Sequence, residues 1–93
     1  MKRKLVILGG GESGVGAALL AKKEGYDVVL MDEGSLKDGY RNEIKSAGIL
    51  FVEGSIDEAT LLQADEVVKS PGIPEKNNWI QKLRQKNIPV ISE

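Results

Sequence analysis

The sequence contains neither histidine nor cysteine. These residues supply the imidazole general base, the thiol nucleophile and most ligands of structural zinc, so all three chemistries are excluded from this chain. Disulfide bonds are excluded as well, which fits a cytoplasmic location. We therefore expect no catalytic residue and no metal site within these residues.

The chain also lacks an excess of either charge and a long hydrophobic run. It carries 13 basic and 14 acidic side chains, for a net charge of −1. Such a balance provides no field to attract nucleic acid or an anionic membrane surface. The apolar run at 5–8 is too short for a signal peptide, and no segment approaches the roughly 20 apolar residues of a membrane span. We expect neither nucleic acid nor a membrane as a partner.

With 93 residues, the chain has the length of a single domain. Short apolar runs that end at turn residues are typical of strands buried on both faces of a sheet. The runs predict strands at 5–8, 28–31, 49–52, 66–69 and 88–91.

Helical patterns separate these runs. One helix is predicted over 13–24, and another has Tyr40, Ile44 and Ala47 on one face and ends at Gly48. A capping box from Ser55 to Glu58 predicts the start of a short third helix. The last helix is predicted over 78–86.

The regular alternation of strands and helices predicts an α/β domain over residues 1–93, Rossmann-like, with three layers and a five-stranded parallel sheet. The expected strand order is 3-2-1-4-5, with the switch point between the first and fourth strands. Pro89, which lies inside the predicted fifth strand, cannot donate a ladder hydrogen bond, so this strand belongs at an edge.

A glycine cluster follows the first strand, where Gly9, Gly11 and Gly14 satisfy G-x-G-x-x-G. In such a loop the first glycine permits a tight turn, the second lets a phosphate approach the backbone, and the third lets helix and sheet pack closely. Free N–H groups of the helix start and the Ser13 hydroxyl would supply the anion site. The alternative is a compact turn that binds nothing.

Asp32 ends the second strand, about twenty residues after the glycines, where an acid accepts hydrogen bonds from a ribose or a base. The alternative is a solvated acid that caps a loop. Together with Glu33 it disfavours a 2′-phosphate and hence NADP. Glu12, between the glycines, is expected to face solvent because its charge would oppose a phosphate.

The segment at 69–74, "KSPGIP", leaves the fourth strand on the other side of the switch point. Its prolines and glycine make a rigid loop, which would present backbone groups to a nucleoside. The alternative is that the segment only connects the strand to the next helix. Trp79, on the last helix, is interpreted as a core residue rather than a stacking platform.

Four segments carry a family resemblance: "LGGGESGVG", the strand-ending "MDE", "VEGSID" and "VVKSPGIP". In this order and at these distances they resemble the N-terminal domain of Mur ligases, the ATP-dependent ligases of peptidoglycan synthesis, and most closely the D-glutamate-adding branch. The resemblance covers the whole chain. The pairing of the glycine motif with "SPGIP" is its most specific part.

The resemblance implies a domain that holds the UDP part of UDP-N-acetylmuramoyl-L-alanine. The glycine loop would take the diphosphate, the end of the second strand the uracil, and the proline-glycine loop the ribose or uracil. The implied UDP-binding residues are Gly9, Gly11, Glu12, Ser13, Gly14, Asp32, Glu33, Ser70, Pro71 and Gly72.

No G-x-x-x-x-G-K-[ST] motif occurs in the chain, so we expect no cofactor on this domain. The resemblance implies that ATP and Mg²⁺ belong to a parent enzyme, on central and C-terminal domains that the sequence does not include. We expect the fragment alone to be inactive.

Two alternatives remain at this point. One is the NAD-binding Rossmann domain of a dehydrogenase or channel regulator, which shares the glycine loop and Asp32 but does not predict "SPGIP". The other is a nucleotide-free interaction module whose glycines serve packing alone.

Overall fold

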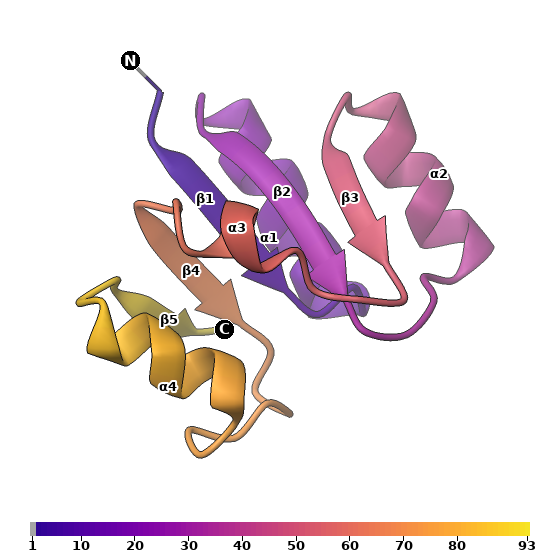
Figure 1. Cartoon of the computed structure of the whole chain (residues 1–93). Coiled ribbons are helices and arrows are strands. Elements are labelled where there is room, and N and C mark those ends of the chain that lie inside the picture. Colours follow the sequence, from indigo (N-terminus) through magenta and orange to yellow (C-terminus); the bar gives the residue numbers. More distant parts are fainter. Residues whose placement is uncertain (1) are drawn as a thin grey trace.

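The computed structural model describes residues 2–93 and shows strands alternating with helices along the chain (Figure 1). The nine elements of this part of the chain are β1 (Lys4–Leu8), α1 (Glu12–Lys23), β2 (Asp27–Asp32), α2 (Asp38–Ser46), β3 (Leu50–Glu53), α3 (Glu58–Leu61), β4 (Glu66–Lys69), α4 (Asn78–Gln85) and β5 (Val90–Ser92).

All strand pairs in the sheet are parallel, and the strand order is β3-β2-β1-β4-β5. This confirms the predicted fold class, strand order and switch point between β1 and β4. The helices α1 and α2 lie behind the sheet in Figure 1, and α3 and α4 lie in front of it. The sheet is therefore the middle of three layers.

The central strand β1 supplies both halves of the core. Leu5 and Ile7 pack with α1 and α2, whereas Val6 and Leu8 pack with α3 and α4. All four side chains are buried. This two-sided burial explains why the strand is a continuous apolar run instead of an alternating one.

The predicted capping box at Ser55 is wrong. Helix α3 begins at Glu58, and its N-cap is Asp57, whose Oδ1 accepts a hydrogen bond from the Thr60 N–H at 3.3 Å. Asp57 Oδ2 also accepts from the Thr60 hydroxyl at 2.8 Å. Aspartate caps a helix as well as serine does, so the better-placed acid takes the role.

The predicted position of Pro89 inside the fifth strand is also wrong, because β5 begins one residue later, at Val90. The proline carbonyl still accepts a hydrogen bond from the Val67 N–H of β4 at 2.9 Å. The edge position of the strand is confirmed. Proline is tolerated there because no strand lies on the far side to need its missing N–H.

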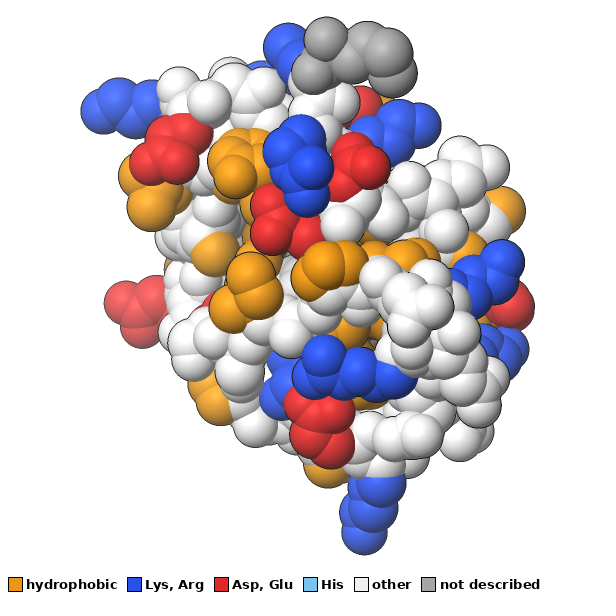
Figure 2. Space-filling model, turned by 90° about the vertical axis from the view of Figure 1, so that its left-hand side faces the viewer, with side chains coloured by type: hydrophobic (Ala, Val, Ile, Leu, Met, Phe, Trp, Pro, Cys, Tyr) orange, Lys and Arg blue, Asp and Glu red, His pale blue; other side chains and the backbone are white. Residues whose placement is uncertain are grey.

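The molecular face around β5 and α4 carries mixed charge. Figure 2 shows acidic and basic side chains interspersed on it, and hydrophobic side chains in a broken band across its middle. Ile91 of β5 is one of the exposed large apolar residues.

Within residues 2–93, no helix is both long and apolar enough to cross a bilayer.

Helix α1 approaches β1 at Gly14. A Cβ on Gly14 would overlap the carbonyl oxygen of Gly9, a backbone atom that cannot swing away. A Cβ on Gly16, one half-turn further along the same helix, would meet nothing within 4 Å.

We predict that replacing glycine by alanine has opposite effects on the free energy of unfolding at positions 14 and 16. Gly14→Ala should lower the free energy of unfolding by about 1–3 kcal/mol through overpacking. Gly16→Ala, the matched control, should raise it by about 0.5–1 kcal/mol because alanine is the better helix former. Urea denaturation of both variants tests this, and equal shifts in the two midpoints would contradict the close helix–strand packing.

Candidate functional site

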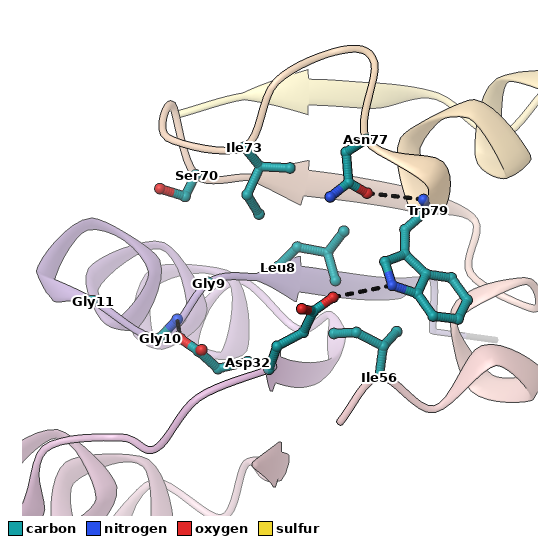
Figure 3. A pocket seen from close by; sticks show the side chains of 11 residues that line it. Leu8, Gly9, Gly10, Gly11, Asp32, Ile56, Ser70, Ile73, Asn77 and Trp79 are labelled. Atoms are coloured by element: carbon teal, nitrogen blue, oxygen red, sulfur yellow. Dashed lines mark hydrogen bonds between the residues drawn. The ribbon is translucent and has the colours of Figure 1, made fainter. Parts of the chain in front are cut away.

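A pocket opens at the carboxyl edge of the sheet, at the switch point between β1 and β4. Its volume is about 310 Å³. Loops that follow β1, β2, β3 and β4 supply its walls, together with the start of α4 (Figure 3). The lining residues are Leu8, Gly9, Gly10, Gly11, Asp32, Glu33, Ile56, Ser70, Ile73, Asn77 and Trp79.

The glycine loop turns sharply at Gly9, which has a φ of +107°. Only glycine adopts this conformation without strain. The Gly9 N–H donates to the Met31 carbonyl of β2 at 2.8 Å, and a Cβ there would lie 2.9 Å from the Ser70 Cβ. The first glycine thus makes the tight turn that the motif predicts and lets the loop after β4 come close.

The second glycine of the motif faces open space. Gly11 is the N-cap of α1, and a Cβ there would meet nothing within 4 Å. In the part of the chain that the structure describes, the hydrogen bonds include no protein acceptor for the N–H groups of Gly11, Glu12, Ser13 and Gly14. Four free donors at a helix N-terminus, with open space in front of Gly11, form a favourable environment for an anion.

Asp32 braces the glycine loop from the neighbouring strand. Its Oδ2 accepts from the Gly10 N–H at 2.7 Å, and its Oδ1 accepts from the Gly34 N–H at 2.8 Å. An ionised carboxylate has about four acceptor positions, so two remain for a ligand. Asp32 therefore has a structural role in the free domain and retains hydrogen-bonding capacity toward the pocket that it lines.

A second carboxylate holds the loop between β2 and α2. Glu53 Oε1 accepts from the Leu36 N–H at 2.7 Å and from Arg41 Nη2 at 2.7 Å. Arg41 Nη2 also donates to the Leu36 carbonyl at 3.0 Å. The buried Leu36 side chain then packs so closely on Gly10 that a Cβ there would overlap it. This clamp fixes the outer side of the glycine loop.

Trp79 lies across the pocket from the glycine loop, with Leu8 and Ile73 between them (Figure 3). Its indole Nε1–H donates to Glu33 Oε1 at 3.1 Å, which joins the start of α4 to the end of β2. The Lys82 ammonium lies 4.9 Å from the ring centroid. Trp79 also packs against the core beneath α4, so the interpretation as a core residue holds for part of its surface only.

Sequence patterns did not indicate Trp79, Ile56, Ile73 or Asn77 as lining residues. Asn77 caps α4 by accepting from the Trp79 N–H at 2.8 Å, and this cap sets the orientation of the first helical turn. An Asn before an apolar-periodic segment is a helix-start signal. It marks the start of α4, but it does not reveal which loops the helix start will face.

The predicted site residues divide into two groups. Gly9, Gly11, Asp32, Glu33 and Ser70 line the pocket together. The other five lie next to it: Glu12, Ser13, Gly14, Pro71 and Gly72.

Within the second group, Glu12 is exposed, as predicted, and lines a shallower hollow on the outer side of the glycine loop. Ser13, beside it in the first turn of α1, is also exposed. The Gly72 N–H donates to Ser70 Oγ at 3.3 Å, so the proline-glycine loop is folded back on itself beside the pocket.

Comparison with known proteins identifies the family of this chain. The family model described as "Mur ligase MurD-like, N-terminal domain" matches residues 3–92. This chain belongs to the Mur ligase family, as a MurD-like N-terminal domain. A curated relative from Christiangramia forsetii, named UDP-N-acetylmuramoylalanine--D-glutamate ligase, is 52% identical over the whole chain, which corresponds to 21% of that protein. The chain thus spans about a fifth of the curated relatives that it matches.

Solved structures show how widely the Mur ligase domain shares its fold. A pseudomurein peptide ligase type C from Methanothermus fervidus superposes with a TM-score of 0.84 at 24% identity, over 98% of this chain and 19% of that one. Cryptosporidium parvum malate dehydrogenase superposes with a TM-score of 0.58, over 84% of this chain and 27% of that one. This second match shows a shared Rossmann-like fold and no more.

We predict that Asp32→Asn destabilises the Mur ligase domain by about 1–3 kcal/mol, because one of two backbone N–H groups loses its charged acceptor. The matched control is Asp27→Asn, at the exposed opposite end of β2, which should change stability by less than about 0.5 kcal/mol. Guanidinium denaturation measures both. Equal midpoints for the two variants would contradict the bracing role.

Acid should release the clamp at Glu53. The Arg41 guanidinium, and then the Leu36 N–H, hold the pKa of Glu53 below its ordinary value of 4.5. Because this pKa is lowered in the folded state, ionised Glu53 stabilises the fold above about pH 4.5, and its contribution disappears as the pH falls through the folded-state pKa.

The stability difference between wild type and Glu53→Gln should therefore be present at pH 7 and shrink as the pH falls below about 4.5. Glu24→Gln, at the exposed C-cap of α1, serves as the control for the loss of one acidic charge. Thermal melts at several pH values measure the differences. A stability difference between wild type and Glu53→Gln that stays constant with pH would rule out the ionised clamp.

Proposed function

We propose that this domain binds the UDP moiety of UDP-N-acetylmuramoyl-L-alanine, as the N-terminal part of a ligase that adds D-glutamate to it. The observation that carries the proposal is the set of four free N–H groups at the start of α1, beside a pocket of single-nucleotide size. The names of the curated relatives supply the identity of the substrate.

The diphosphate would lie on the glycine loop. No Lys or Arg lines the pocket, so within it the attraction for phosphate would come from the backbone N–H groups and the helix dipole. Lys37 lines the neighbouring hollow on the outer side of the glycine loop. The Ser13 hydroxyl would add one hydrogen bond. The open space in front of Gly11 lets a phosphate oxygen reach the N–H groups directly.

The uridine would enter the pocket between the glycine loop and Trp79. Leu8, Ile56 and Ile73 offer apolar surface for a base, and the Asp32 and Glu33 carboxylates accept hydrogen bonds from base N–H or ribose hydroxyl groups. A volume of about 310 Å³ is at the lower end of small-molecule sites, which span about 300–1,000 Å³. This size fits one nucleoside better than the two of a dinucleotide such as NAD.

The ligation itself would take place beyond these residues. The parent enzyme would activate the alanyl carboxylate with ATP and Mg²⁺ as an acyl phosphate, which the amine of D-glutamate then attacks. Since the 93-residue chain has no G-x-x-x-x-G-K-[ST] loop to hold a triphosphate, we propose that it binds nucleotide without catalysing any step. With the sugar and peptide unsupported, the dissociation constant should be on the order of 0.1 mM or weaker.

Gly11→Val is predicted to abolish UDP binding while the domain remains folded. A Cβ at position 11 would meet no protein atom within 4 Å in the free domain, whereas the valine side chain would occupy the path of the phosphate. Ser13→Ala should weaken binding by only about 0.5–1.5 kcal/mol, the contribution of one hydrogen bond. Gly16→Ala, on the exposed side of α1, is the control that should bind like wild type.

Trp79 is the single tryptophan and lines the pocket, so its fluorescence reports occupancy. Titrations with UMP, UDP-N-acetylglucosamine and NAD, followed by this fluorescence and by amide NMR shifts, separate the candidate functions. Saturable shifts at Gly11–Gly14 and Trp79 with the two uridine ligands, and none with NAD, are the expected result. A preference for NAD, or unchanged affinity in folded Gly11→Val, would overturn the proposal.

A further inference from the structure

Lys69, the last residue of β4, is buried, with 6% of its surface exposed. It is the single buried charged or polar residue within the described part of the chain. Its side chain points to the layer of α3 and α4, as does that of Val67 two residues earlier on the strand. The nucleotide site proposed above does not use it directly, because Lys69 does not line the pocket.

The partners of the Lys69 ammonium are neutral oxygens. Nζ donates to the Ile73 carbonyl at 2.8 Å and to Ser92 Oγ of β5 at 3.3 Å. Within residues 2–93 no ion pair joins Lys69 to a carboxylate. The pKa of Glu75 is lowered chiefly by its hydrogen bond from Arg84, at 2.9 Å, and the Lys69 charge adds to this without a bond to the Glu75 carboxylate.

This arrangement is unfavourable for stability alone. Removing an ammonium from water has a high cost, and neutral acceptors recover less of it than a carboxylate does. Methionine has a similar length and would fill the same space without a charge. The hydrogen bonds of Lys69 therefore fix the positions of the groups that accept them and do not serve to stabilise the fold.

The geometry in question is that of the loop over residues 70–74. The Ile73 N–H donates to the Ser70 carbonyl at 3.0 Å, and the Gly72 N–H donates to Ser70 Oγ. At its start the loop is anchored to β1, since the Ser70 N–H donates to the Leu8 carbonyl at 3.0 Å. At its far end the Ile73 carbonyl is anchored by Lys69, and the Ile73 side chain forms a wall of the pocket.

We propose that Lys69 is a positioning residue for nucleotide binding, which holds the Ile73 carbonyl and so keeps the 70–74 loop in its binding conformation before a ligand arrives. The proposal rests on the uridine site described above. Without the ammonium, the Ile73 carbonyl turns toward water and the loop samples other conformations. Ligand binding then has to restore the order of the loop, which lowers the affinity.

The test is Lys69→Met, with Lys86→Met as the control. Lys86 is exposed at the C-cap of α4, so its substitution removes the same charge without contact with the loop. For Lys69→Met we expect an unchanged or higher Tm and a UMP affinity reduced about five- to tenfold. In the absence of ligand, ¹⁵N relaxation should show added mobility at Gly72 and Ile73 and none at Gly9–Gly14.

The relaxation experiment separates this proposal from that of the uridine site, because it needs no ligand. If wild type failed to bind UMP, the proposed function would fall, and loop mobility in Lys69→Met would still decide whether Lys69 orders the loop. A lower Tm or a failure to fold would overturn the proposal, since it would show that Lys69 serves stability. Unchanged loop relaxation, or an equal affinity loss in Lys86→Met, would overturn it too.

Discussion

The contact on which this structure depends most is that between two glycines. The Gly9 carbonyl lies against the Cα of Gly14, so closely that a Cβ on Gly14 would overlap its oxygen. This approach sets the first turn of α1 directly on the end of β1, at the centre of the sheet. The free N–H groups of that turn consequently open at the switch point, where loops from both halves of the sheet meet.

The site obtains its shape from groups that a ligand does not have to touch. Asp32 holds Gly10, and Glu53 with Arg41 holds the loop that carries Leu36 onto the same glycine. A glycine-rich loop has little conformational preference of its own, so these charged acceptors supply the order that the backbone lacks. A nearly neutral domain can in this way present ordered backbone N–H groups to an anion, with no Lys or Arg in the lining of the pocket itself.

Much of the candidate site could be predicted because its parts lie close together in the sequence. Within one βα unit, Gly9 makes the tight turn, Gly11 leaves space in front of the helix start, and Gly14 lets the helix pack closely on the strand. Asp32 was predicted because it follows the glycine motif by about twenty residues, at the end of the next strand, and it does line the pocket. The helix cap at Asp57 was missed because Ser55 and Asp57 offer equivalent caps two residues apart.

The sequence by itself determined the strand order, the family and the loop that offers free N–H groups, because buried strands, helix faces and glycine spacing leave local patterns. The tertiary structure alone decided the roles of Trp79, Arg41 and Lys69. Trp79 meets Glu33, 46 positions away, and Lys69 reaches Ser92, 23 positions away. An indole, a guanidinium or an ammonium has no local signature for the acceptor it will meet, since that acceptor is chosen by how the crossover connections bring distant loops to one edge of the sheet.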